Sequence, residues 1–242
     1  MKIMYEMIRY HGRVYVKSSQ YSMPLGILIV FLAFIYHIIP VFIIDSFTLS
    51  GAVVFYIMVW IGLSYHRLEP PVSQQIITLR LNKAWKYYVS DSIFLTLLGM
   101  AAGTICMLYP LMLNLIYRDQ VFLRQILAAD ILAAWLIHCA AGFAGSAVGT
   151  FFHPRVMKDR KAAVIITALV ALLAVVKAGM VSEMPGLKWL MWVFPPLAEV
   201  IAVFTGEPFY EIHAVLYAVC SLAIYGVILS VVRIGIQTHN KF

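Results

Sequence analysis

Six long apolar runs constrain the fold of this chain more than any other feature. Each run has roughly the 20 mostly apolar residues that a helix needs to cross the hydrocarbon core of a membrane. Within that core every backbone N–H and C=O must be paired inside the segment, so the runs predict α-helices. They occupy residues 24–47, 49–65, 92–117, 129–152, 162–181 and 213–234.

Composition supports the same fold class. The chain is 63% hydrophobic and only 12% charged, with a mean hydropathy of +0.90. An ordinary soluble domain is about half apolar, so that class is excluded. We therefore expect an all-α, polytopic integral membrane protein with six transmembrane helices, organised as a single transmembrane domain over residues 1–242.

A seventh apolar stretch, residues 187–204, is interrupted by Pro195 and Pro196 and carries Glu199. Irregular backbone is not tolerated where it faces lipid at depth. We expect this stretch to form an external re-entrant or interfacial segment before the last helix. Glu199 is then a half-buried carboxylate near the outer face, able to contact a substrate or Lys188.

The basic residues give the orientation. Six spans place both termini on one side of the membrane, together with loops 66–91 and 153–161. The chain has 18 Lys and Arg, and cytoplasmic segments carry the excess of these residues. We therefore expect a multi-pass protein of the cell membrane with both termini in the cytoplasm, and the net charge of +7 requires no nucleic acid. The only Lys and Arg left for the other side are Arg118, Arg124, Lys177 and Lys188.

The N-terminal residues 1–22 have the pattern of an amphipathic helix that lies in the plane of the membrane surface. Charged residues share one helical face, and apolar residues share the other. The charged face holds Lys2, Glu6, Arg9, Arg13 and Lys17, and the apolar face holds Ile3, Met4, Met7, Ile8, Val14 and Tyr15.

The loop at 67–91 is polar between two apolar runs, and it is longer than a connection between antiparallel helices needs to be. Pro70 and Pro71 end the second span, because a residue before proline is pushed out of the helical region. Apolar residues at helical spacing then predict a short helix over Val72–Leu81. Asn82 can cap the next helix, and the aromatic residues that follow suit the membrane interface.

The order of these features resembles the permease subunits of ATP-binding-cassette type-2 transporters. The resemblance rests on Glu69 after the second span, the short amphipathic segment Val72–Leu81, the polar break at Asn82 and Lys83, and Lys86-Tyr87-Tyr88 at the start of an apolar span. The N-terminal amphipathic helix and the external segment before the last span also fit. Pro70 and Pro71 depart from the polar sequence that usually follows this Glu in the family.

The resemblance implies a partner and two sets of site residues. A coupling helix in this loop docks on a cytoplasmic ATP-binding-cassette ATPase subunit, and the second and fifth spans line the pathway. The implied coupling residues are Glu69, Val72, Gln74, Gln75, Ile76, Leu79, Arg80 and Lys83. The implied pathway residues are Tyr56, Trp60, Leu173 and Val176, to which the position of Glu199 near the outer mouth adds a fifth.

The sequence contains no Gly-x-x-x-x-Gly-Lys-Ser/Thr phosphate loop, so ATP and Mg²⁺ are expected on the separate subunit and no cofactor or metal on this chain. The chain is then not itself an enzyme. A second permease chain, identical or related, would complete the pathway. The apolar pathway fits an apolar or amphipathic substrate such as a peptide, a drug or a lipid.

Other functions stay open at this point. His138 and His37 lie in predicted spans, where an ionisable group is a functional hypothesis by default. A neutral His that is hydrogen-bonded to a neighbouring helix is the simpler interpretation. Small-residue stripes at Gly99/Gly103 and Ala141/Gly145/Gly149 indicate helix packing within the chain. The alternatives are a non-transporting membrane anchor or assembly protein, an intramembrane enzyme, or a secondary transporter.

Overall fold

The computed structural model describes residues 2–81, 83–152, 156–157 and 159–239. Those residues form helices joined by short connections, without a β-strand among them. The helices are α1 (Lys2–Lys17), α2 (Ser22–Ile35), α3 (Ile43–Tyr65), α4 (Pro71–Arg80), α5 (Trp85–Ile116), α6 (Ala128–Phe151), α7 (Arg160–Glu183), the 3-10 helix η1 (Pro185–Leu187), α8 (Lys188–Met191), α9 (Leu197–Phe204) and α10 (Ile212–His239).

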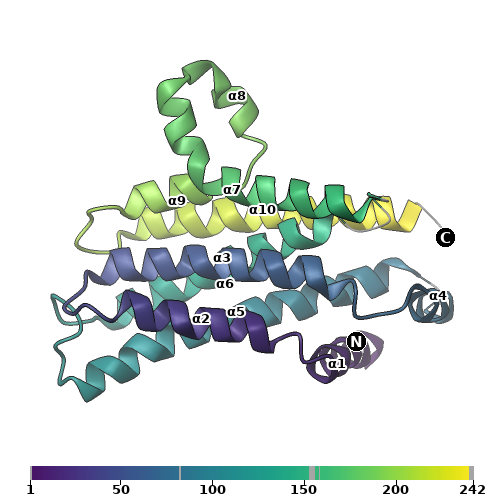
Figure 1. The fold of residues 1–242 in the computed structure, drawn as a ribbon, viewed down its shortest axis with the longest axis horizontal. Helices are drawn as coiled ribbons and strands as arrows, with labels where there is room; N and C mark the ends of the chain where they lie inside the picture. Colours follow the sequence, from purple (N-terminus) through teal and green to yellow (C-terminus); the bar gives the residue numbers. More distant parts are fainter. Residues whose placement is uncertain (1, 82, 153–155, 158, 240–242) are drawn as a thin grey trace.

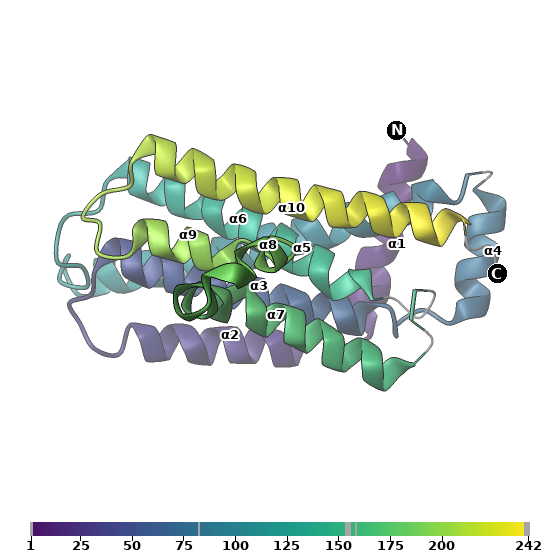
Figure 2. The same cartoon turned by 90° about the horizontal axis from the view of Figure 1, so that it is seen from above.

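The long helices lie along one axis and form an elongated bundle (Figures 1 and 2). Helix α6 is at its centre, packed against α3, α5 and α10. Helices α1 and α4 run across the bundle axis at one end, which we call the α4 end. The connections α2–α3, α5–α6 and α9–α10 lie at the opposite end. Segments η1 and α8 project sideways from the bundle (Figure 1), and Trp189 is 90% exposed there.

The helices have the lengths and composition of membrane spans. In the described part of the chain, α3, α5, α6, α7 and α10 are each long and apolar enough to cross a membrane. Helices α1 and α2 meet at a bend of 78° and count together as a sixth candidate. The protein is therefore an all-α, multi-pass membrane protein, as the sequence predicts.

The first two spans are divided at a different place from the one expected. The sequence analysis placed them at 24–47 and 49–65, whereas α2 ends at Ile35 and α3 begins at Ile43. Pro40 has no N–H to donate and disfavours the helical conformation at the preceding residue. The turn is then fixed by hydrogen bonds between Val41 and the loop after α5, from the Val41 N–H to the Val121 carbonyl (2.9 Å) and from the Leu123 N–H to the Val41 carbonyl (3.1 Å).

Two other spans are longer than expected. Helix α5 begins at Trp85 instead of residue 92, and α10 continues to His239 instead of residue 234. The extra turns of α5 include Asp91, which binds Arg233 near the end of the expected last span, so helix continues beyond the apolar run. The stretch 187–204 is broken as its prolines require, because α9 starts only after Pro196.

Helix α1 packs across α5 through one buried stripe. Met7, His11 and Tyr15 are buried, at the i, i+4, i+8 spacing of one helical face. Ile3, which was expected on the face turned to the membrane, is 54% exposed within the chain. The buried stripe includes His11, which has polar partners in the bundle.

Close contact between α3 and α6 depends on glycine. A Cβ on Gly145 would fall on the carbonyl oxygen of Phe55, and a Cβ on Gly149 on that of Val59. Gly99 and Gly142 bring α5 and α6 together in the same way, since a Cβ on Gly142 would lie 3.0 Å from the Gly99 Cα. The small-residue stripes therefore serve packing within the chain, as expected.

Candidate functional site

Helix α4 presents an apolar stripe at the α4 end of the bundle. The sequence predicted a helix at 72–81, and the helix covers Pro71–Arg80, with proline in its first turn, where the missing N–H costs nothing. Val72, Ile76 and Leu79 are 63%, 47% and 76% exposed. Their spacing places them on one face of α4, and Thr78 on another face is buried. Among the described residues, this face is therefore largely exposed and available to a partner.

The remaining predicted coupling residues lie around this helix. Arg80 and Lys83 are exposed, whereas Glu69, Gln74 and Gln75 are half-buried. The Gln74 side chain donates to the Tyr87 hydroxyl over 3.4 Å, which turns it toward α5. Asn82, the expected cap of the next helix, lies outside the described residues.

Glu69 is the point at which three helices meet. Its carboxylate accepts a 2.7 Å hydrogen bond from the Tyr10 hydroxyl of α1 and a second hydrogen bond from the Tyr87 hydroxyl of α5. Hydrogen bonds to an ionised carboxylate are the stronger kind. The segment that leads into α4 is thus fastened to α1 and α5, so a displacement of α4 is passed to both helices.

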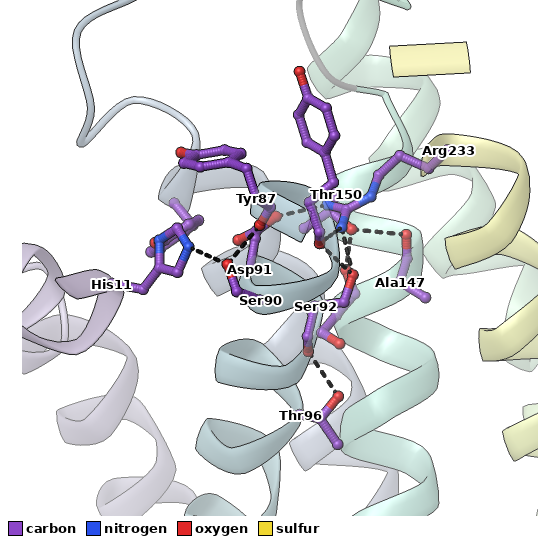
Figure 3. Close-up of polar contacts among 12 residues, drawn as sticks. His11, Tyr87, Ser90, Asp91, Ser92, Thr96, Ala147, Thr150 and Arg233 are labelled. Atoms are coloured by element: carbon purple, nitrogen blue, oxygen red, sulfur yellow. Dashed lines mark hydrogen bonds and ion pairs between the residues drawn. The ribbon is translucent and has the colours of Figure 1, made fainter. Parts of the chain in front are cut away.

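His11 continues this network into the bundle. The Ser90 hydroxyl donates to the Tyr87 carbonyl (2.7 Å), so its oxygen is free to accept from His11 Nε2 at 3.0 Å. His11 Nδ1 then accepts from the Tyr65 hydroxyl at 2.6 Å. Figure 3 shows the ring pointing from α1 to Ser90. A neutral imidazole with one N–H satisfies every partner.

Burial lowers the pKa of His11, and the nearby carboxylates of Asp91 and Glu69 act in the opposite direction. Burial, assisted by the Glu69 hydrogen bond, raises the pKa of Tyr10. Both shifts favour the neutral forms that the hydrogen bonds require.

A buried ion pair lies next to His11. Arg233 of α10 binds Asp91 of α5 over 3.0 Å and donates to the Ser92 hydroxyl over 2.6 Å (Figure 3). Both charged side chains are at most 3% exposed. The pair joins the two helices across the bundle, beside the segment of α5 that holds Tyr87 and Ser90.

The predicted pathway residues lie on α3, α7 and α9. Tyr56 is partly exposed and donates to the Ala171 carbonyl of α7 over 3.1 Å, and Trp60 lies one turn further along α3. On α7, Val176 is exposed and Leu173 half-buried. The structure therefore brings Tyr56 to α7, which carries two of the other expected residues.

Glu199 of α9 pairs with a different lysine from the one considered. Its carboxylate lies 2.9 Å from Lys177 Nζ of α7, and Lys177 also donates to the Phe194 carbonyl over 3.2 Å. The Lys177 side chain is 3% exposed and that of Glu199 is 45% exposed. The bend after Pro196 aims Glu199 at α7, away from the Lys188 that sequence proximity suggested.

His138, in the middle of α6, has all its hydrogen-bond partners within the chain. His138 is fully buried, its Nδ1 donates to the Ala134 carbonyl over 2.6 Å, and its Nε2 accepts from the Ser50 hydroxyl over 2.8 Å. Every polar atom of the ring is thus satisfied by the chain itself. His37 is exposed in the α2–α3 turn. No group of three or more potential metal ligands occurs among the described residues.

Sequence reasoning missed His11, Asp91 and Arg233. The only signal for them is that each is polar on a helical face or at a span end where apolar residues prevail.

Comparisons of the chain with protein-family models, with curated proteins and with solved structures found no match.

Proposed function

We propose that this chain is the permease subunit of an ATP-driven exporter, and that it receives its driving force through α4. The observation that carries the proposal is the combination of an unpartnered apolar face on α4 with the fastening of its leading segment, through Glu69, to α1 and α5. A docking helix needs both an exposed face and a firm connection to the spans.

The partner in this proposal is a cytoplasmic ATPase subunit that binds ATP and Mg²⁺. Nucleotide can drive a conformational change only if the complex has different affinity for the two states. Movement of α4 would act on Glu69 and pull on Tyr10 and Tyr87 together. It would also reach α10, because Asp91 lies one turn beyond Tyr87 and binds Arg233.

The face formed by α3, α7 and α9 is the proposed pathway. Helix α9 lies beside the half of α10 that is farther from the α4 end (Figures 1 and 2). It therefore lies alongside the long helices and not beyond their ends. A carboxylate that is 45% exposed there would be costly against hydrocarbon. Glu199, together with Tyr56 and Trp60, is better placed against water, substrate or a second permease chain. Because this face carries few charges, it suits an apolar or amphipathic substrate.

Purification in mild detergent tests the proposal. We expect an ATP-hydrolysing subunit to be recovered in a fixed ratio with this chain, and the ATPase activity to depend on it. Replacing Ile76 and Leu79 by Asp is expected to abolish the association while the chain still inserts in the membrane. Leu123→Asp, at an exposed apolar residue of the opposite end, is the matched control and should retain the partner.

Recovery of the functional chain without an ATPase would contradict the proposal and favour the membrane-anchor alternative. Unchanged association in the Ile76/Leu79 variant would show that the exposed face of α4 is not the docking surface.

A further inference from the structure

A basic pocket lies at the α4 end of the bundle, and no residue of the Glu69 network lines it. It has a volume of about 120 Å³ and is formed where α3 ends and α7 begins. Its polar lining includes Arg67 and His66, which follow α3, and Arg160, the first residue of α7. Leu63, Ala163 and Val164 form the apolar part of its lining.

The two guanidinium groups are close enough to repel. Partial burial and the positive charge of Arg160 together lower the pKa of Arg67. Neither arginine has an ion pair with a described acidic residue. The acids nearest in sequence are engaged elsewhere. Asp159 accepts from the Lys161 N–H as the N-cap of α7, and the Glu69 carboxylate accepts from Tyr10 and Tyr87. Two adjacent cations without a compensating acid are stabilised by a bound anion.

The shape of the anion follows from the rest of the lining. Arginine offers planar pairs of N–H donors that match phosphate oxygens. The apolar residues belong to α3 and α7, both candidate spans, so the pocket has a basic part at the end of the bundle and an apolar part formed by the spans. A ligand with a phosphate at one end and hydrocarbon at the other fits both parts.

We propose that the pocket between Arg67 and Arg160 binds the phosphate of an anionic phospholipid, whose glycerol and acyl region rests on Leu63, Ala163 and Val164. Basic pockets between transmembrane helices are known recognition sites for such headgroups. The lipid would hold the end of α3 to the start of α7. The site is independent of the proposed transport function.

Native mass spectrometry of the purified full-length chain tests the proposal with phosphatidylglycerol and phosphatidylcholine as probes. We expect phosphatidylglycerol to be retained preferentially. Replacing Arg67 and Arg160 by Gln should weaken its apparent affinity on the order of 30-fold, since each basic residue near a membrane surface contributes about 1 kcal/mol. The control replaces Arg118 and Lys188, two exposed cations away from the pocket, by Gln and should bind as the unaltered chain does.

Equal retention of the two lipids, or equal phosphatidylglycerol affinity in the Arg67/Arg160 variant and the control, would overturn the proposal. Inorganic phosphate supplies the second arm. If phosphate alone protects the unaltered chain against heat while phosphatidylglycerol does not, the pocket binds a free anion and the lipid assignment is wrong.

A measurement on the unaltered protein covers the case in which the variant fails to fold. In nanodiscs, amide hydrogen exchange at residues 63–67 and 160–164 should be slower with phosphatidylglycerol than with phosphatidylcholine. Equal exchange at these residues in the two lipids would also overturn the proposal.

Discussion

The hydroxyl of Tyr10 donates a 2.7 Å hydrogen bond to the carboxylate of Glu69, joining the surface helix α1 to the segment that leads into α4. Tyr87 of α5 binds the other oxygen of the same carboxylate. Glu69 therefore works as a shared acceptor, and α1 cannot shift relative to α4 without breaking a bond to an ionised group. Single substitutions at these residues can therefore test the network at the α4 end.

Tyr10→Phe is expected to loosen α1 with little other change. The variant removes one donor to the Glu69 carboxylate and keeps the ring, so we expect a loss of about 1.5–3 kcal/mol in the free energy of unfolding, the range for hydrogen bonds to charged groups. Thermal unfolding of the purified chain in detergent measures the loss. Tyr5→Phe is the control, because Tyr5 is on the same helix and 64% exposed. Equal midpoints for the two variants would mean that the Tyr10 hydroxyl does not hold α1 in place.

His11 makes the protein less stable in acid. Burial lowers its pKa in the folded chain, so the unfolded chain binds the proton first as the pH falls. Above about pH 6.5 both states are neutral at this residue and it contributes no pH dependence. Below that value the free energy of unfolding decreases with falling pH, until the folded chain is protonated as well.

The midpoint of thermal unfolding, measured from about pH 7.5 to about pH 5, tests this sign. His11→Gln, which keeps a donor and an acceptor, is expected to give a shallower decrease than the unaltered chain. His37→Gln, at an exposed histidine, controls for the removal of a histidine as such. An unchanged slope in His11→Gln would assign the acid sensitivity to other groups.

Gly145→Ala and Gly149→Ala are expected to separate α3 from α6. Each new methyl group would meet a backbone carbonyl of α3, which cannot rotate away, so the helices must move apart. Overpacking of this kind costs about 1–3 kcal/mol. The control Gly179→Ala adds a methyl group with no atom within 4 Å and should be neutral or slightly stabilising, since alanine favours helix.

Denaturation in mixed micelles with increasing SDS ranks these three variants. If Gly145→Ala and Gly149→Ala unfold at the same proportion of SDS as Gly179→Ala, the α3–α6 contact is looser than its geometry indicates.

Local patterns predicted those parts of the fold that depend on local physics. The apolar runs are long enough to define membrane helices wherever their partners lie, and the short helix before Asn82 follows from two prolines and a spacing of three to four residues. The glycine stripes belong to the same group, because small residues at one helical face have few uses other than close packing. The division of the first two spans failed because Pro40 and the pairing of Val41 with the loop after α5 outweigh a continuous apolar composition.

The polar network was beyond such patterns. His11 binds Tyr65 and Ser90, which are 54 and 79 residues away, and the partners Asp91 and Arg233 are 142 residues apart. In sequence His11 is one of several polar residues on α1, and Asp91 and Arg233 stand near the ends of apolar runs, where a solvated position is equally reasonable. Lys177 shows the same limit: the sequence only assigned it to the outer side of the membrane, and it is buried against Glu199 because α9 packs on α7.

Arg233→Met is expected to be the most destabilising of these changes. It leaves the Asp91 carboxylate buried without its partner, which costs about 3–5 kcal/mol. Replacing both residues, Asp91 by Leu and Arg233 by Met, removes the uncompensated charge and should recover much of the loss, so the two changes are not additive. SDS-induced unfolding of the two single variants and the double variant measures the coupling. Glu211→Ala breaks an exposed contact with His213 and serves as a control that should change little. A loss in Arg233→Met no larger than in this control would show that the ion pair does not join α10 to α5 energetically.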